Sequence, residues 1–219
     1  ILVLTNVQFG QAGSYAAQVS NAYGTTNSAA AVLTVNPPPP CSVPPAGLVS
    51  WWRGEGNATD TAGANNGTLV GNTTYGAGNV GQGFVFDGNG DAVQVGNPVS
   101  LQLQNFTIEA WVKRTSATAV SINGSLGMLF AYGSGGYGLY LDGTGHPTLS
   151  RIGFDNVTVS AAITDTSFHH VAVTKSGSTV VFYVDGTAYP AAAYDPGFTF
   201  TTTARIGADS DSVENSFLG

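Results

Sequence analysis

Residues 106–112 read FTIEAWV, a run in which apolar side chains recur at every second position. This period of two is typical of a β-strand with one buried face. The dipeptides Asp87-Gly88, Asp142-Gly143 and Asp185-Gly186 lie beside similar runs, as in tight hairpins. No segment has a helical period, so the sequence predicts a large antiparallel β-sandwich. The other predicted strands cover residues 83–86, 92–95, 138–141, 170–173 and 180–184.

The composition supports an all-β protein. Hydrophobic residues make up 42% of the 219 residues, which is enough for a sizeable core. Charged residues make up only 9%, whereas an average globular domain has roughly 25%. Helical bundles and coiled coils need Lys, Arg and Glu on their solvent face, so both are excluded.

The charge balance excludes two classes of partner. The net charge is −7, and the six basic residues are scattered from Arg53 to Arg205. Nucleic acids and anionic lipids both require clustered Lys and Arg, so we expect neither as a partner. No apolar run is long enough to span a bilayer, and the first ten residues lack the basic region of a signal peptide.

The chain divides at a proline-rich stretch. No charged residue precedes Arg53, and the stretch NPPPPCSVPPA occupies residues 36–46. Consecutive prolines favour a polyproline II rod and cannot donate hydrogen bonds to a sheet. We therefore predict a linker at 36–46 between modules at 1–35 and 47–219. Cys41 is the single cysteine, so it cannot form an internal disulfide.

The first module has three predicted strands, at residues 1–7, 14–20 and 30–35. The stretch QAGSY at residues 11–15 resembles the tyrosine corner of immunoglobulin-like domains, with Gly13 and Tyr15 at the matching positions. Gln11 replaces the usual acid, and Ala17 stands where the family has cysteine. The resemblance implies that residues 1–35 are the last strands of such a domain, with the Tyr15 hydroxyl bonded to upstream backbone.

Several motifs of the second module resemble the laminin G-like domain of the concanavalin A-like lectin and glucanase superfamily. This resemblance implies an antiparallel β-sandwich of the jelly-roll type over residues 47–219. That family continues after the FLG of residues 217–219 with an acidic dipeptide and one more strand, so we expect a domain that lacks its last strand. The motifs are GLVSWW at 47–52, DTAGANNGTL at 60–69, GNVGQGFVFDGNG at 78–90, FTIEAWV at 106–112, FHHVAVT at 168–174, YVDG at 183–186 and RIG at 205–207.

The acidic residues do not predict a hydrolase. Glucanases of this superfamily carry carboxylates that alternate along one strand. Glu55 and Glu109 are isolated, and Asp209 and Asp211 lie in a Ser-rich stretch that indicates a loop. The residues His169-His170 point to opposite faces of a strand and cannot ligate one metal together. We therefore expect no enzymatic activity.

A structural calcium ion is the predicted cofactor. Its candidate ligands and turn residues are Asp60, Gly63, Asn65 and Asn66, with Gly67 adding curvature. Hard cations prefer carboxylate, amide and backbone oxygens on tight turns, and related laminin G-like domains hold calcium at such a loop. The alternative is that these residues cap their own backbone. Asp209 and Asp211 are lesser candidates.

Aromatic side chains are the candidate ligand-binding residues. Exposed rings stack on the apolar face of a sugar. We predict Tyr132, Tyr137 and Tyr140 as ligand-binding residues, with partial burial in the core as the alternative. Of the neighbouring Trp51 and Trp52, only one should be buried. The residues expected in the core are Phe106, Trp111 and Phe182, and further surface candidates are Tyr189 and Tyr194.

These observations favour a secreted or cell-surface bacterial protein with a non-catalytic module for binding and adhesion. The expected partner is a glycan or a component of the extracellular matrix. A second hypothesis is a structural repeat unit, in which open sheet edges accept strands from neighbouring copies and build a filament. A third is an accessory part of an enzyme whose catalytic domain lies elsewhere.

Overall fold

A computed structural model describes residues 3, 7, 9–35, 44–210 and 212–219. The chain forms two compact units, Ile1–Ala46 and Gly47–Gly219. Three of the sequence predictions fall outside the described residues: most of the strand at 1–7, the proline run with Cys41, and Asp211. No described helix is long and apolar enough to cross a membrane.

The first unit consists of two short antiparallel pairs. A 3₁₀ turn at Phe9–Gln11 precedes them, and the Tyr15 hydroxyl donates to the Gln11 carbonyl at 2.6 Å. The predicted strand at 14–20 is interrupted at Ala16 and Ala17, where the Ala17 N–H donates to the Ser28 hydroxyl. The assignment to an immunoglobulin-like domain stays a prediction. The pairs are β1 (Gly13–Tyr15) with β4 (Ala31–Leu33), and β2 (Gln18–Asn21) with β3 (Gly24–Asn27).

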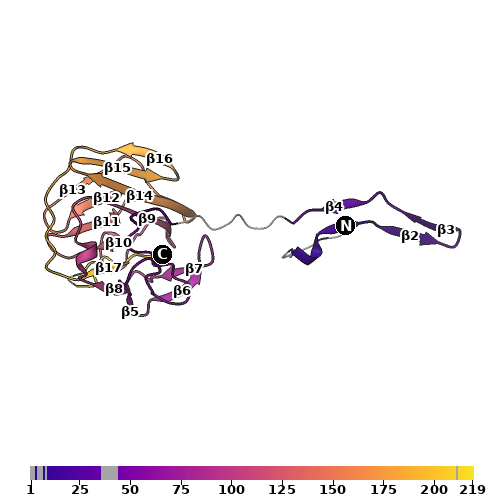
Figure 1. Cartoon of the computed structure of the whole chain (residues 1–219), viewed down its shortest axis with the longest axis horizontal. Coiled ribbons are helices and arrows are strands. Elements are labelled where there is room, and N and C mark those ends of the chain that lie inside the picture. Colours follow the sequence, from indigo (N-terminus) through magenta and orange to yellow (C-terminus); the bar gives the residue numbers. More distant parts are fainter. Residues whose placement is uncertain (1–2, 4–6, 8, 36–43, 211) are drawn as a thin grey trace. The chain divides into compact units, whose positions relative to one another are not determined.

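The second unit is a β-sandwich (Figure 1). One sheet has seven strands in the order β13-β12-β11-β10-β17-β8-β5, and the facing sheet has four in the order β16-β15-β14-β9. All pairs are antiparallel, and β6 (Thr74–Ala77) forms a separate hairpin with β7 (Gln82–Val85). The large sheet contains β5 (Thr68–Val70), β8 (Ala92–Gly96), β10 (Gly127–Ala131), β11 (Tyr137–Leu141), β12 (Pro147–Arg151), β13 (Asp155–Thr158) and β17 (Ala204–Ile206). The small sheet contains β9 (Phe106–Lys113), β14 (Phe168–Ser176), β15 (Thr179–Val184) and β16 (Thr187–Pro190).

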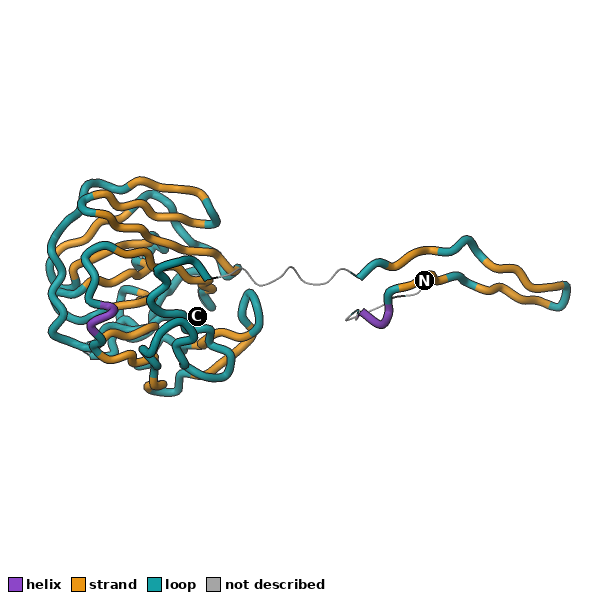
Figure 2. The backbone as a smooth tube through the Cα atoms, in the orientation of Figure 1, coloured by secondary structure: helices purple, strands orange, loops and turns teal. Residues whose placement is uncertain are grey.

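Both sheets contribute to one hydrophobic core. Val173 and Phe182 of the small sheet and Leu139 and Val93 of the large sheet are fully buried in the same cluster. Three long loops, at residues 114–126, 159–167 and 191–203, cross between the sheets (Figure 2). The predicted all-β antiparallel sandwich is therefore confirmed, and the six alternating runs predicted for this unit are strands. The stretch at residues 47–52, which in the family forms the opening strand, makes only an isolated bridge between Trp52 and Asp60.

The outer edge of β9 is open. Within residues 44–210 and 212–219, β9 pairs only with β14. The end of the chain lies close to the last residue of β9, because Leu218 accepts the Thr115 N–H at 3.1 Å. Gly219 also exchanges two backbone hydrogen bonds of 2.8 and 3.1 Å with Phe86. The inward side chains of Ile108 and Ala110 consequently stay partly exposed.

Candidate ligand-binding surfaces

Trp111 is exposed on the outer face of the small sheet. The strand β9 alternates strictly, and the positions that pack toward the core are Phe106, Ile108, Ala110 and Val112. Trp111 belongs to the other set and is 53% exposed. The prediction that Trp111 builds the core is therefore wrong, because its strand turns the opposite phase inward. Phe106 and Phe182 do pack in the core, as predicted.

Strand pairing surrounds Trp111 with polar and aromatic groups. Trp111 is opposite His170 of β14, with ring centroids 5.4 Å apart in an edge arrangement. The His170 Nε2 lies 3.6 Å from Glu109 Oε2. Ala172 separates Glu109 from Tyr183 of β15, since it pairs with both. We call this set, Trp111, His170, Glu109 and Tyr183 around Ala172, the aromatic platform.

The two adjacent histidines have different partners, as their alternation predicts. His169 lies between two carboxylates, with Nδ1 2.7 Å from Asp185 and Nε2 3.1 Å from Asp165. Burial alone would lower the pKa of His169, but hydrogen bonds to Asp185 and Asp165 raise it above its ordinary value. Asp185 also accepts the backbone N–H of His170 at 2.9 Å, which fixes the start of β14 beneath the platform.

No metal centre is formed by these side chains. Across the described part of the chain, no three His, Cys, Asp or Glu side chains are grouped so that they could hold a metal ion. The contacts of His169 and His170 thus serve the sheet and the platform.

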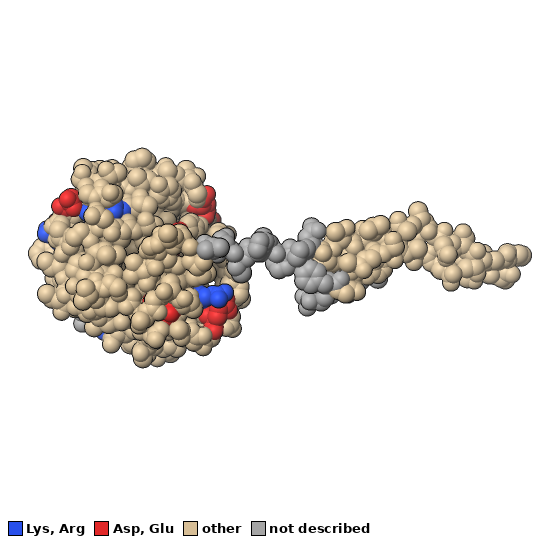
Figure 3. Space-filling view, in the orientation of Figure 1, with Lys and Arg blue, Asp and Glu red and all other residues tan. Residues whose placement is uncertain are grey.

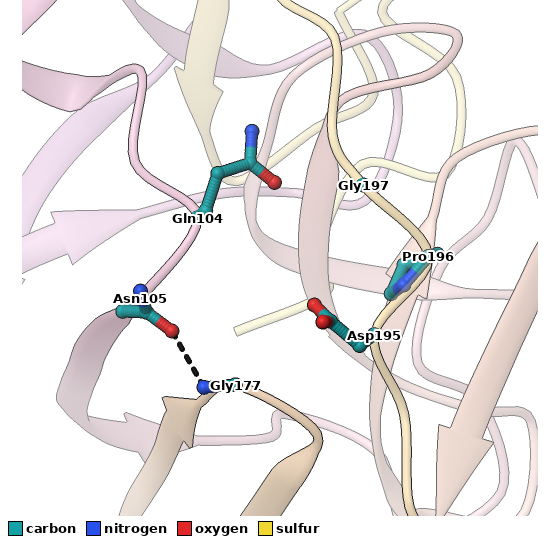
Figure 4. A pocket seen from close by; sticks show the side chains of 6 residues that line it. All are labelled: Gln104, Asn105, Gly177, Asp195, Pro196 and Gly197. Atoms are coloured by element: carbon teal, nitrogen blue, oxygen red, sulfur yellow. Dashed lines mark hydrogen bonds between the residues drawn. The ribbon is translucent and has the colours of Figure 1, made fainter.

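A polar groove lies at the N-terminal end of β9, whereas Trp111 is near the C-terminal end of this strand (Figure 4). Its volume is about 420 Å³. Gln104 holds one wall, because its amide both accepts the Phe198 N–H and donates to the Phe198 carbonyl, each at 2.8 Å. Asn105 holds the other, since its Oδ1 accepts the Gly177 N–H at 2.6 Å. The lining residues are Gln104, Asn105, Gly177, Asp195, Pro196 and Gly197.

The groove contains one carboxylate, and its charge is balanced. The Lys175 ammonium is fully buried and donates to Asp195 Oδ1 at 2.7 Å and to the Gly177 carbonyl at 2.8 Å. The Asp195 side chain is about half exposed, so its second oxygen is open to a ligand. A buried charge that is paired and hydrogen-bonded is retained, and the groove therefore has a fixed, nearly neutral lining.

The predicted tyrosines do not form a binding surface. Tyr132, Tyr137 and Tyr140 are only 0%, 3% and 6% exposed. Tyr132 and Tyr137 face the core, where burial raises the pKa of Tyr132 to about 12 and the Tyr137 hydroxyl donates to the Leu101 carbonyl at 2.6 Å. Tyr140 lies on the opposite face of its sheet but packs against Met128 and its neighbours. The expectation that these three rings reach the surface is wrong.

The remaining aromatic predictions have mixed outcomes. Tyr194 is buried and Tyr189 is partly buried against the core. Of the neighbouring tryptophans, Trp51 is 44% exposed, whereas Trp52 stacks on Phe130 with ring centroids 6.1 Å apart. The expectation that only one of the two packs inward is confirmed.

The predicted calcium residues are brought together around Asp60. Its Oδ1 accepts the N–H groups of Trp51, Ala62 and Gly63 at 2.8, 3.0 and 3.0 Å, and its Oδ2 accepts the N–H of Asn65 at 3.1 Å. The Asn66 Oδ1 accepts the Asp60 N–H at 3.0 Å. Gly63 is packed closely, since a Cβ there would come within 2.5 Å of the Val49 carbonyl.

This arrangement does not fit a calcium ion. Calcium takes six to eight oxygen ligands, whereas the oxygens of Asp60 and Asn66 face N–H donors. The Asn65 amide is also engaged, because it donates to the hydroxyls of Ser50 and Ser100. The loop thus has the geometry of the alternative considered above, in which these residues cap their own backbone. Calcium binding stays a prediction.

Comparison with known proteins identifies related folds. A family model described as the concanavalin A-like lectin/glucanases superfamily matches residues 87–219. A similar solved structure is domain 4 of AbnA, a GH43 extracellular arabinanase from Geobacillus stearothermophilus, in complex with arabinotriose. That domain is 14% identical with a TM-score of 0.59, and the match covers 76% of this chain and 84% of that one.

A second similar structure is the full-length tailspike protein 2 of the Escherichia coli O157:H7 bacteriophage CAB120, at 13% identity and a TM-score of 0.47. The match covers 70% of this chain and 24% of the tailspike. No curated protein sequence matches the chain. At these identities the likeness to solved structures concerns the fold alone.

Proposed function

The chain belongs to the concanavalin A-like lectin/glucanase superfamily, and on this premise we propose that residues 47–219 form a non-catalytic carbohydrate-binding module. The observation that carries the proposal is the exposed indole of Trp111 on the aromatic platform. An indole face stacks on the apolar face of a sugar ring, while Glu109 and His170 offer an acceptor and a ring nitrogen to its hydroxyls.

The structural neighbour supports a saccharide as ligand. It is domain 4 of an extracellular arabinanase, and its structure contains arabinotriose. We propose by analogy that this protein acts outside the cell, where it binds a polysaccharide. Adhesion to a glycan-bearing surface or matrix would follow from the same binding.

The distribution of carboxylates supports a non-catalytic role. Glycoside hydrolases place two carboxyl groups on either side of the scissile bond. The groove has a single carboxylate, Asp195, and it is paired with Lys175. The platform has a single carboxylate, Glu109, which lies beside His170. Neither surface has the pair that hydrolysis requires.

An array of polysaccharides tests the proposal. We expect the 219-residue protein to bind at least one neutral plant or microbial polysaccharide, arabinan included, with equal affinity in calcium and in EDTA. The platform contains no metal ligand set, so chelation should not matter. The absence of binding to every polysaccharide in both conditions would contradict the proposal. Binding only in the presence of calcium would contradict a site on the platform and indicate that the Asp60 loop takes part in binding.

A second candidate function, a structural repeat built by strand exchange, is favoured by the open edge of β9. Its unpaired backbone groups and the partly exposed Ile108 and Ala110 could accept a strand from a second copy. Size-exclusion chromatography with light scattering, followed by electron microscopy, distinguishes the two roles. Strand exchange predicts oligomers or filaments that grow with protein concentration, and monomers at every concentration would count against it.

A further inference from the structure

The aromatic platform and the groove lie along one strand. On β9 the exposed positions are Thr107, Glu109, Trp111 and Lys113, and Asn105, immediately before the strand, lines the groove. Trp111 is six positions after Asn105, which corresponds to roughly 20 Å of extended chain. This length is greater than one sugar ring can cover, so the two surfaces would contact different parts of a ligand.

The paired residues between the two surfaces are small or polar. Trp111 pairs with His170, Glu109 with Ala172, and Thr107 with Thr174. The small Ala172 side chain leaves Glu109 accessible, and two threonine hydroxyls lie side by side nearer the groove. We call this ribbon, from Trp111 to Asn105 with the paired residues of β14, the β9 track. It offers hydrogen-bonding groups at regular intervals instead of an apolar surface.

We propose that the β9 track binds a linear, uncharged oligosaccharide longer than a disaccharide, with one ring stacked on Trp111 and a distant ring held in the groove. This inference rests on the proposed carbohydrate-binding function and names the ligand class and its direction along the sheet. The contacts in the groove and the charge of the track support it.

The groove has one donor and one acceptor available for hydroxyl groups. Asn105 Oδ1 is occupied by the Gly177 N–H, which orients the amide and leaves Nδ2 as a donor. Asp195 Oδ1 is occupied by Lys175, and its Oδ2 has no hydrogen-bond partner within the described residues. Hydroxyl groups both donate and accept, so a pair of them on one sugar ring complements Nδ2 and Oδ2 together. Because Gln104 and Asn105 hold the walls, the site is formed before the ligand arrives.

The charges favour a neutral ligand. Within the track, Asp195 is paired with Lys175, and Glu109 lies beside His170. The nearest exposed ammonium is that of Lys113, two positions beyond Trp111, and its Nζ lies 5.4 Å from the centroid of the Phe168 ring. The two carboxylates of the track disfavour an acidic sugar along it. Charged side chains on the visible face of this unit occur only in separate spots (Figure 3). The protein as a whole is acidic, with a net charge of −7, which disfavours polyanions. A second copy of the chain fits less well, since the centres of protein interfaces are depleted in charged residues such as Glu109.

Calorimetry with oligosaccharides of increasing length tests the inference. The probes are neutral arabinan, xylan, glucan and mannan oligosaccharides, each from the disaccharide to the hexasaccharide, titrated into the full chain. For the class that binds, we expect the dissociation constant to fall at least tenfold beyond the disaccharide and then to level off. No binding by any class would contradict the proposed function itself. Equal affinity for disaccharide and hexasaccharide would contradict the track and leave the function standing.

Two variants locate the distant end of the ligand. Asn105→Asp keeps the oxygen that accepts the Gly177 N–H but removes the Nδ2 donor. It should therefore lower the affinity for the hexasaccharide about tenfold and leave the affinity for the disaccharide unchanged. Asn89→Asp adds the same charge at an exposed position outside the track and should change neither. Thr107→Lys, also at an exposed position, blocks the middle of the track without touching the groove walls and should give the same length-dependent loss. A variant effect that is equal at all lengths would overturn the proposed path.

Discussion

Replacing Trp111 by alanine is expected to lower the affinity for the bound saccharide by about 30-fold, which corresponds to about 2 kcal/mol. The indole is the largest exposed ring of the platform, and its removal deletes both the stacking surface and the edge contact to His170 at 5.4 Å. Stability should change little, because the ring contributes to an exposed face and the core side of β9 stays intact. Calorimetry with the best ligand from the array measures the effect.

Trp51→Ala provides the matched control. Trp51 is also a well exposed tryptophan, at 44%, and it interacts with a cation, since the Arg53 guanidinium lies 5.2 Å from its ring centroid. It lies outside the β9 track, so this variant should bind with the affinity of the wild type. Wild-type affinity in Trp111→Ala, or a loss in Trp51→Ala as large as the loss at Trp111, would show that the platform is not the binding site.

Alternation along the chain is the signal from which the sandwich could be predicted. Runs such as residues 138–141 and 180–184 lie next to Asp-Gly turns, and the structure has strands there. The strand β10 was not predicted, because Gly127–Ala131 is buried at every position and a continuous apolar run has no period of two. The strand β12 begins at Pro147, a residue that usually ends a strand but is tolerated at its first position.

The aromatic platform could be predicted from the sequence, whereas the groove could not. Trp111 is two and four positions from the polar residues Glu109 and Thr107, so its ring points to the same outer face of β9 as their side chains. The size of the indole suggested the core and outweighed that signal. The groove joins residues 104–105, 177 and 195–197, which only the tertiary fold brings together. The burial of Tyr132 and Tyr137 likewise depends on which sheet covers them.

Replacing Asp60 by alanine is expected to lower the free energy of unfolding by about 3 kcal/mol at neutral pH. The carboxylate accepts four backbone N–H groups, and its removal leaves these donors without a partner in a loop that is closed around Gly63. Chemical denaturation of both proteins measures the difference. Asp142→Ala is the control, because Asp142 accepts N–H groups of a turn in the same way but is 33% exposed, so water can replace it at a cost of about 1 kcal/mol.

The pH dependence identifies the charge of Asp60 as the cause. Burial alone would raise the pKa of Asp60, but the four N–H bonds outweigh it and lower the pKa below its ordinary value. The unfolded chain then binds a proton more readily than the folded one, so this stabilisation is complete above the unfolded pKa of about 3.9 and is lost as the pH falls through the folded value. The difference in the free energy of unfolding between wild type and Asp60→Ala should therefore stay constant from neutral pH to about pH 5 and become smaller below about pH 4.

A difference that widens on acidification would contradict this account of Asp60. The same titration, repeated in calcium and in EDTA, decides the role of the loop, because a carboxylate held by N–H groups needs no cation. Equal stability in both conditions is the expected result. A calcium-dependent increase in the stability of the wild type that Asp60→Ala abolishes would instead assign the loop to the metal site that the family resemblance implies.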